Sequence, residues 1–550
     1  MEITENAAVI SSEVDEQKKE PLFRGSLDGH DLSEELLNEE LEKLEVQLSG
    51  TKVSFFNSIT LGNPQIFTWV LVAFASMGGL LSGLDQSLIS GANLYMPADL
   101  HLDSGQVSLV DSLMPLGAVL GALILSPTNE LLGRKLSIIV ACLLYTLGAG
   151  LEAGAHSVGM MYAGRFILGM GLGLEGGTVP VYVAECVARK FRGNLVSLYQ
   201  FNIALGEVFG YVVAAIFVNV SGTWRWMLGS SLLFSTILLI GMIFMPESPR
   251  YLMHKGREVE SYSVWKRIRG VSDIDAKREF IVMRHLVEQE QEEKKRLRYP
   301  YLDFIRVPRC RRAIVYANIM VFLGQFTGVN AIMYYMSVLM SEVGFSAKKS
   351  VFMSLVGGGS LLLGTIPAIL WMDRFGRRVA AITLLPGFFI GLLIIGFGYF
   401  IPLSDVHAAE GVYITGLIIY MWFFGSYACL TWVLPSEVYP TYLRSYGMTS
   451  SDATLFLCAF IVTYNFTRMQ NAMTKTGLAV GFYGGIAVFG WIYQVLCMPE
   501  TKNKTLEEID LVFSKPTKEL VKENWQSAKE TVSDLFHLRW KRAFGLQQDS

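Results

Sequence analysis

The sequence predicts an all-α membrane protein whose twelve transmembrane helices form two parallel repeats of six. Three observations predict this fold: an apolar composition, a series of apolar runs long enough to cross a bilayer, and charged motifs that occur twice. Hydrophobic residues make up 51% of the 550 residues and charged residues 17%, which argues against a chain of several soluble domains. The net charge of -3 gives no reason to expect a nucleic-acid partner.

Twelve stretches of the sequence are apolar enough and long enough to cross a bilayer. Its hydrocarbon core is about 30 Å thick, which requires roughly 20 apolar residues in a helix. Lys and Arg are more frequent in the loops on the side of the two termini, so we expect both termini in the cytoplasm. The predicted spans are 66–92, 107–127, 136–156, 160–184, 194–219, 226–245, 312–342, 350–372, 379–401, 411–436, 444–468 and 476–498.

A long charged connection divides these spans six and six. Before the first span, the leucine spacing over 31–48 fits one amphipathic helix, and a mostly disordered tail is the other interpretation. We expect five parts: an acidic cytoplasmic N-terminal tail (1–65), an N-terminal six-helix half (66–250), a cytoplasmic helical linker (251–311), a C-terminal six-helix half (312–502) and a cytoplasmic C-terminal tail (503–550).

Neither the glycines nor the cysteines of the sequence indicate a cofactor or metal site. The run GLGLEG at 171–176 matches a dinucleotide-binding pattern, but it lies inside a predicted span, where no strand can precede it. Its glycines indicate close helix packing instead. The six cysteines show no CxxC or Cys/His spacing, so we expect neither a disulfide framework nor a zinc site.

Three charged motifs occur once in each half, which is typical of a duplicated unit. ELLGRK (130–135) matches DRFGRR (373–378), and PESPR (246–250) matches PETK (499–502). The third pair is a glutamate followed seven residues later by an arginine, after the fourth and the tenth span. Two halves of equal orientation place a substrate site between them near the membrane midplane.

The charged groups of these motifs have a mechanical role if the two halves rock. Carboxylates and guanidinium groups can pair when the cytoplasmic side is closed and separate when it opens. The other interpretation is that they only anchor helix ends at the lipid headgroups. The expected cytoplasmic gating charges are Glu130, Arg134, Glu185, Arg192, Glu247, Arg250, Asp373, Arg374, Arg377, Glu437, Arg444 and Glu500.

Taken together, the paired Gly-Arg loops, the PESPR and PETK motifs and their order between twelve spans resemble the sugar porter family of the major facilitator superfamily. The resemblance covers roughly 66–515 and is closest to fungal sugar and polyol porters, with some likeness to inositol carriers. It implies a secondary transporter, not an enzyme, that works by alternating access. We expect a small polyhydroxylated substrate, protons and the lipid bilayer as partners, function as a monomer, and the plasma membrane, or alternatively the vacuolar membrane, as the location.

The resemblance also implies which residues contact the substrate. Amide side chains both donate and accept hydrogen bonds, which suits a neutral polyhydroxylated ligand, and an aromatic face can cover its C–H surface. An aromatic residue in a span could equally be part of the packed core, and this is the other interpretation of Trp432. The residues carried over from the family are Gln200, Gln325, Asn330, Tyr334 and Trp432.

Several positions depart from the family's pattern, including the Gly-Pro pair that the family has before the tryptophan at 432. Gly324 and Leu361 stand where the family has a glutamine and an asparagine. Leu455 and Phe456 replace a polar residue and a tryptophan. These departures put the common hexose pose in doubt, and efflux of a more apolar small metabolite is the competing hypothesis. A non-transporting receptor on the same fold would typically carry a longer cytoplasmic tail.

Ionisable residues inside the spans indicate functional sites because they are costly in hydrocarbon. Proton-coupled sugar porters resemble this chain in having an aspartate at the place of Asp85 and an arginine at the place of Arg165, which implies proton symport. A permanent structural pair and facilitative uniport are the alternatives. Glu175 and Asp452 match no common functional position of the family; they either line the cavity or are neutralised by protonation and buried hydrogen bonds.

Overall fold

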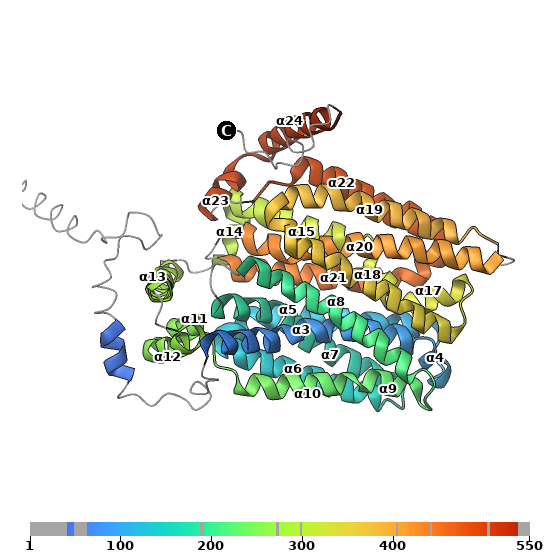
Figure 1. The fold of residues 1–550 in the computed structure, drawn as a ribbon, viewed down its shortest axis with the longest axis horizontal. Coiled ribbons are helices and arrows are strands. Elements are labelled where there is room, and N and C mark those ends of the chain that lie inside the picture. Colours follow the sequence, from blue (N-terminus) through green and yellow to red (C-terminus); the bar gives the residue numbers. More distant parts are fainter. Residues whose placement is uncertain are drawn as a thin grey trace, which may run out of the picture.

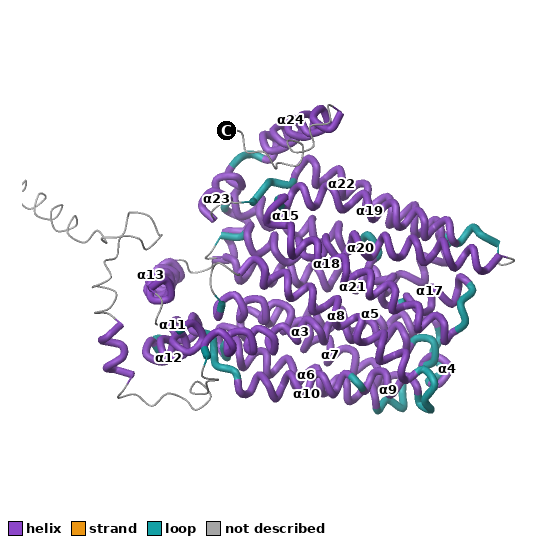
Figure 2. The backbone as a smooth tube through the Cα atoms, viewed as in Figure 1, coloured by secondary structure: helices purple, strands orange, loops and turns teal. Residues whose placement is uncertain are grey.

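The computed structural model describes residues 41–48, 63–187, 192–270, 274–296, 300–402, 405–440, 443–502 and 506–536. Helices make up almost all of this part of the chain, and none of its residues form a strand (Figures 1 and 2). The long helices run side by side in one bundle. Short helices lie at both of its ends.

The N-terminal half consists of helices α3 to α10. Its bounds agree with the first six predicted spans to within a few residues, and a break at Ser230 divides the sixth span into two helices. The elements are α3 (Pro64–Ala92), α4 (Met96–Asp99), α5 (Ser104–Leu131), α6 (Arg134–Ala153), α7 (Val158–Cys186), α8 (Arg192–Phe217), α9 (Thr223–Gly229) and α10 (Ser231–Phe244).

The C-terminal half is less regular, because its first predicted span, 312–342, is interrupted twice. The chain leaves the first helix at Phe326 and resumes after Gly328, whose φ is +89°. A side chain there would be strained. The elements are α15 (Pro308–Gln325), α16 (Val329–Tyr334), α17 (Met336–Val343), α18 (Ala347–Phe375), α19 (Arg377–Gly398), α20 (Val406–Val438), α21 (Arg444–Met473), the π-helix η6 (Gly477–Tyr483) and α22 (Gly484–Cys497).

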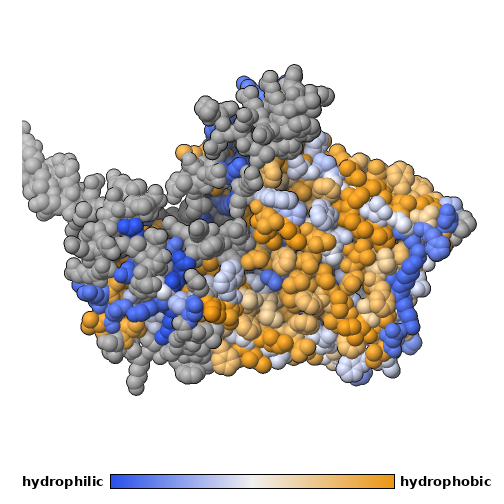
Figure 3. Space-filling model, in the orientation of Figure 1, coloured by the Kyte–Doolittle hydropathy of each residue, from blue (hydrophilic) through white to orange (hydrophobic). Residues whose placement is uncertain are grey.

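Eleven helical segments of the described chain are long and apolar enough to cross a membrane. The remaining predicted span corresponds to α21, a 30-residue helix that packs against α5 and α15 inside the bundle. Its run of Ser450, Ser451, Asp452 and Thr454 makes it more polar than the others. The outer face of the bundle is apolar between two polar ends (Figure 3), as expected of a multi-pass membrane protein.

The two halves meet along paired helices. In Figure 1 the N-terminal half, in blue and green, lies below the C-terminal half, in yellow and red. Helix α5 packs on α21, and α8 packs on α18. Hydroxyl groups bridge this seam toward both ends, at Ser126 with Ser445 and at Ser108 with Thr467, each at 3.2 Å. Side chains from both halves can therefore reach a common site.

Close glycine contacts within the N-terminal half agree with the predicted helix packing. A Cβ atom on Gly117 would lie 2.1 Å from the carbonyl oxygen of Phe166, and one on Gly169 would lie 2.1 Å from that of Met114. Backbones this close exclude any side chain. Small residues thus bring α5 against α7, as they do in many membrane helix pairs.

A second, smaller core lies at the end of the bundle where the linker is located. We call this end the linker end. The linker contains α11 (Pro249–His254), α12 (Glu258–Arg269), α13 (Ile274–Arg296), η3 (Pro300–Leu302) and α14 (Asp303–Arg306), and α23 (Leu506–Ser514) and α24 (Thr517–Phe536) follow the last span. Residues 41–48 are helical, and Leu41 and Leu44 are buried against Tyr262 and Trp265. The rest of the predicted helix, 31–40, lies outside the described residues.

This contact between the tail and the linker is also polar. The Glu45 carboxylate accepts hydrogen bonds from the Tyr262 hydroxyl at 3.1 Å and the Lys266 ammonium at 2.6 Å. The hydrogen bond from Lys266 lowers the pKa of Glu45 because it favours the charged form.

Candidate transport site

Two of the repeated motifs meet at the linker end of the N-terminal half. The Glu247 carboxylate accepts hydrogen bonds from the backbone N–H groups of Arg134 and Lys135, both at 3.1 Å. It therefore caps the first turn of α6, where backbone donors lack helical partners. The preceding Gly133 has φ +92°, and a Cβ atom there would lie 2.5 Å from the Glu247 carboxylate. The glycine of the Gly-Arg motif therefore leaves room for the glutamate of the PESPR motif.

The same arrangement recurs in the C-terminal half. The Glu500 carboxylate accepts from the backbone N–H groups of Arg377 at 3.0 Å and Arg378 at 3.2 Å, at the start of α19. Gly376 has φ +98°, and its missing Cβ would lie 2.6 Å from Glu500.

The third motif completes each cluster. Arg134 Nη2 lies 2.8 Å from Glu185, and Arg377 Nη2 lies 2.9 Å from Glu437. Each of these ion pairs joins two helices of one half, and neither bridges the two halves as the gating hypothesis had predicted. Ser248 and Thr501 donate hydrogen bonds to the same glutamates, and Arg250 pairs with Glu290 of the linker. Of the other predicted gating charges, Glu130 and Arg444 also have interaction partners, whereas the side chains of Arg192, Asp373 and Arg374 lie outside the described part.

A cavity of about 70 Å³ lies between the halves, large enough for several water molecules. Of the predicted substrate residues it is lined by Gln200, Gln325, Asn330 and Trp432. The other lining residues are Ser82, Gln86, Tyr199, Ile203, Glu207, Val329, Met333, Phe424, Ala428, Thr431, Leu455 and Phe456. Amides and one indole thus face a space that is otherwise mixed in polarity.

The polar groups of the cavity are already partly paired. The indole N–H of Trp432 donates to Gln200 Oε1 at 2.9 Å, across the seam between the halves. The Tyr199 ring lies edge-on to Trp432 with centroids 5.2 Å apart. In the C-terminal half, the Asn330 amide donates to Gln325. These contacts fix the orientations of the side chains that a polar ligand in the cavity would contact.

A charged cluster lies in the core of the N-terminal half, where Arg165 is fully buried. Its Nη1 atom lies 2.8 and 2.9 Å from the two carboxylate oxygens of Asp85, and 3.6 Å from Glu152. The Nε–H group donates to the Val110 carbonyl at 3.2 Å. Asp85 and Arg165 are therefore in direct contact, as the sequence led us to expect. The second acid, Glu152, was missed.

Comparison with known proteins agrees with these features. The model of the family "Sugar (and other) transporter" matches residues 71–513, which include both halves, the cavity and the paired motifs. The chain belongs to this family. It is thus a transporter, as the charged motifs and the inter-half cavity had led us to expect.

Several relatives of this transporter carry names that describe a substrate. The chain is 64% identical over 513 residues to "Myo-inositol transporter FST1" of Gibberella moniliformis, covering 92% of the chain and 89% of that protein. It is 30% identical over 467 residues to "Myo-inositol transporter 1" of Cryptococcus neoformans, covering 81% of each. It is 31% identical over 450 residues to the "Galactose-proton symporter" of Escherichia coli K12, covering 80% of the chain and 94% of the relative.

A solved structure has the same fold. The proton:xylose symporter XylE, of the major facilitator superfamily, bound to 6-bromo-6-deoxy-D-glucose, superposes with a TM-score of 0.70 at 24% identity. The match covers 81% of this chain and 99% of that one. At this identity the likeness shows the fold alone.

One predicted substrate residue of the transporter lies apart from the cavity. Tyr334 is buried, and its hydroxyl is 3.5 Å from the sulfur of Met114 on α5. On α16, Val329, Asn330 and Met333 line the cavity instead. The family pattern gives only the position of Tyr334 along the chain. Which residues of α16 face the cavity depends on the break after α15.

Several polar residues of the cavity were not predicted, and three of them come from the N-terminal half near predicted residues. Ser82 and Gln86 lie on α3, close in sequence to Asp85, and Glu207 lies on α8. The same signal that led to Asp85, an ionisable residue in an apolar span, could have found Glu207.

Glu175 and Asp452 are not among the residues that line this cavity. Both are buried, and Glu175 Oε1 and Asp452 Oδ2 have no hydrogen-bond partner among the described residues. Glu175 packs against Gly78 of α3, and Asp452 packs across the seam against Gly177 of α7. The first interpretation, that they face the substrate, has no support from this cavity.

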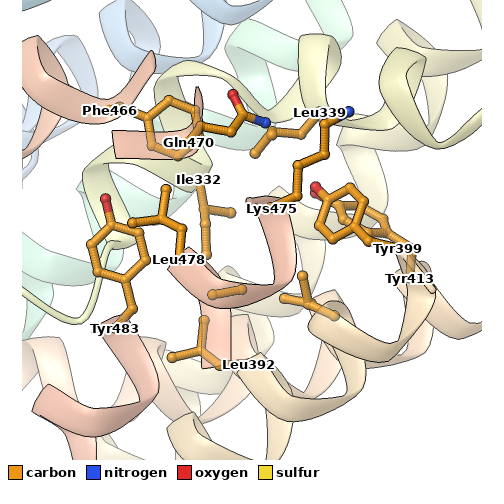
Figure 4. Close-up of a pocket in the computed structure, with 12 residues that line it drawn as sticks. Ile332, Leu339, Leu392, Tyr399, Tyr413, Phe466, Gln470, Lys475, Leu478 and Tyr483 are labelled. Atoms are coloured by element: carbon orange, nitrogen blue, oxygen red, sulfur yellow. The ribbon is translucent and has the colours of Figure 1, made fainter. Parts of the chain in front are cut away.

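A second hollow of about 30 Å³ lies within the C-terminal half, away from the linker end (Figure 4). Its wall is mainly apolar, with Leu339, Leu392 and Phe466, and it includes Lys475 and Gln470. None of the predicted substrate residues lines it. The cavity between the halves is therefore the candidate transport site.

Proposed function

We propose that this transporter moves a cyclitol, with myo-inositol as the first candidate, or a closely related sugar or polyol, by proton symport. The observation that carries the proposal is the 64% identity to a myo-inositol transporter over 92% of the chain. The cavity agrees with such a ligand. Its amides can donate and accept hydrogen bonds, and Trp432 offers a flat face for the C–H surface of a ring.

Alternating access is the proposed mechanism. The cavity lies between two six-helix halves, and rocking of one half against the other would expose it to each side in turn. The seam is held toward both ends by hydroxyl contacts such as Ser126 with Ser445, which are weak enough to break. We further propose that the repeated charges control opening on the cytoplasmic side, with each cluster keeping its own half rigid as it moves.

The Arg165 cluster is the proposed site of proton coupling. Two carboxyl groups, of Asp85 and Glu152, share one guanidinium group, and all three side chains are buried. A buried charge without a partner is strongly unfavourable, so the cluster is balanced when it holds one proton. Protonation of Asp85 would release Arg165, and this exchange could accompany the movement of the halves. Relatives named as proton symporters support the assignment.

We also propose a location and an assembly for the transporter. The linker and both termini would lie in the cytoplasm, consistent with the excess of Lys and Arg in the loops on that side. The plasma membrane is the expected membrane, and one chain contains both halves of the cavity, so a monomer suffices.

Uptake assays test the function. Cells that lack inositol and sugar transport would express the chain, and labelled myo-inositol, other polyols, hexoses and organic acids would be offered with and without a proton uncoupler. We expect accumulation of myo-inositol that the uncoupler abolishes. Uptake that only equilibrates would favour uniport. If no polyol or sugar entered, the proposal would be wrong, and efflux of a more apolar metabolite, suggested by Leu455 and Phe456 in the cavity wall, would be tested next.

A further inference from the structure

We propose that Glu207 binds two neighbouring hydroxyl groups of the substrate and thereby sets the specificity of the site for an intact vicinal diol. This inference rests on the proposed function and deepens it. It predicts that cyclitols lacking one of these hydroxyls, or carrying an O-methyl group there, are poor substrates.

The position of Glu207 places it beside a predicted substrate residue. It follows Gln200 by seven residues on α8, which is about two helical turns, so both side chains lie on one face. Both line the cavity between the halves. Glu207 is only 1% exposed, so the wall holds its carboxyl group away from bulk water.

Among the described residues, the carboxyl group of Glu207 has no hydrogen-bond or ion-pair partner. Its Oε2 atom is buried without a hydrogen bond among the described residues, and none of their Lys or Arg side chains pairs with it. Asp85 and Glu152, by contrast, share Arg165. A buried carboxyl group without hydrogen-bond partners is unfavourable in either protonation state. A ligand that supplies hydroxyl donors would remove this penalty, so an unpaired acid increases affinity for a polyol.

The distribution of polar groups in the cavity indicates how the ligand lies. Ser82, Gln86, Gln200 and Glu207 come from α3 and α8, and Gln325 and Asn330 come from α15 and α16, whereas α21 contributes Leu455 and Phe456. The hydroxyl groups of a ring would therefore face the polar helices, and its C–H face would turn toward α21. The polar contacts that the C-terminal half lacks at Leu455 and Phe456 would be replaced by contacts from the N-terminal half.

The chemistry of a carboxyl group favours a diol over a single hydroxyl. With no cation beside it, the buried Glu207 is balanced when it holds a proton, by the same reasoning as the Arg165 cluster. Its carbonyl oxygen can then accept a hydrogen bond from one hydroxyl while its O–H group donates to another. Two adjacent hydroxyls of a cyclitol can occupy these two positions together.

Equilibrium binding of myo-inositol to the purified full-length transporter tests the proposal. The variants are Glu207→Gln and Glu207→Leu, with Asn202→Ala as the matched control. Asn202 is on the same helix, donates to the Leu198 carbonyl and does not line the cavity. We expect Glu207→Gln to bind close to the wild type, because its amide also accepts and donates, and Kd to rise about tenfold for Glu207→Leu, which loses both hydrogen bonds. The control should bind like the wild type.

A set of monodeoxy-inositols then identifies the contact. The analogue that lacks a hydroxyl bound by Glu207 should bind the wild type weakly, yet bind Glu207→Leu no more weakly than myo-inositol does. This non-additivity would not arise if Glu207 only supported the fold. Wild-type affinity of Glu207→Leu, or additive losses for every analogue, would overturn the inference.

A third measurement needs no variant. A carbodiimide that modifies buried carboxyl groups would be applied to the wild type with and without myo-inositol, and modification of the Glu207 peptide would be measured by mass spectrometry. We expect the ligand to protect Glu207, and unchanged modification at saturating ligand would contradict the proposal. Failure of the wild type to bind or transport any polyol would instead contradict the proposed function itself.

Discussion

The two halves of the molecule are nearly identical at the linker end and differ in the core. Glu247 and Glu500 each cap the helix that starts with their Gly-Arg motif, at distances that agree within a few tenths of an ångström. When Glu185 of α7 is aligned with Glu437 of α20, however, Arg165 falls opposite Leu417. Leu417 is fully buried and apolar. The halves therefore share their clusters at the linker end, but the Arg165 cluster belongs to the N-terminal half.

This difference separates two tasks of the transporter. The shared clusters fix helix ends within each half, which any rigid body that rocks must have. The charged core is present once, which suits chemistry that needs one site. We infer that duplication supplied the mechanical frame, and that proton coupling depends on the N-terminal half.

The largest effect is expected when Arg165 is replaced by the residue at the aligned position of the C-terminal half. Arg165→Leu, which copies Leu417, would leave Asp85 and Glu152 buried without a cation. We expect a loss of about 3–5 kcal/mol of stability, because breaking a buried ion pair leaves an uncompensated charge. Thermal unfolding of the purified protein would show it as a strongly lowered apparent Tm, and transport would be lost.

A triple variant provides the control. Arg165→Leu combined with Asp85→Asn and Glu152→Gln removes the acids together with the cation, so it should regain part of the lost Tm. An Arg165→Leu protein as stable as the wild type would show that the cluster is not held by its charges.

A change of one acid should remove coupling and leave movement intact. Asp85→Asn keeps the shape of the protonated acid but cannot cycle a proton. We expect uphill accumulation to be abolished, while exchange of labelled for unlabelled substrate continues, since rocking around a fixed site needs no proton. Accumulation and counterflow would be measured in the same vesicles. Uncoupler-sensitive accumulation at the wild-type level would place the proton elsewhere, and Glu152, Glu175 and Asp452 would be changed next.

The spans and the repeated motifs of the two halves could be predicted from the sequence, because helix-length apolar runs and short motifs are local features. It could not show that Glu247 reaches the start of α6, since the two motifs lie far apart along the chain and only the fold joins them. The interruption at Gly328 was missed because hydropathy continues across it. Glu207 was missed although its signal, a charge in a span, was the one that identified Asp85. Tyr334 was carried over from the family resemblance, and α16 turns it toward Met114.

Matched changes in the two caps should have matched effects. Glu247→Gln and Glu500→Gln each weaken a carboxylate that accepts several backbone N–H groups at a helix start. We expect each to lose about 1–2 kcal/mol of stability, because charge-assisted bonds become neutral ones. Apparent Tm values of the two variants and of Glu523→Gln, whose carboxylate is more than half exposed, would be compared. A large loss for one cap and none for the other would show that the repeated motifs have diverged in role.

The smallest effects are expected at the contact that joins the halves inside the cavity. Trp432 of the C-terminal half donates to Gln200 of the N-terminal half at 2.9 Å. Each side chain is also a proposed ligand contact, so Trp432→Ala and Gln200→Ala should each weaken substrate binding by about 1 kcal/mol, close to fivefold in Kd. Membrane insertion should be unaffected. Trp422→Phe is a suitable control, because Trp422 is on the same helix but 39% exposed on the outside of the bundle.

Trp432→Phe separates the ring from its N–H group. It retains the aromatic face but leaves Gln200 Oε1 without its donor, so Gln200→Ala should cost less in the Trp432→Phe background than in the wild type. Such non-additivity is expected only for residues that act as a pair. Strictly additive losses would mean that the two residues contact the ligand independently, and wild-type affinity of both alanine variants would remove them from the site. In the first case the halves would be linked through the ligand alone, and the comparison between them would have to be made again with substrate bound.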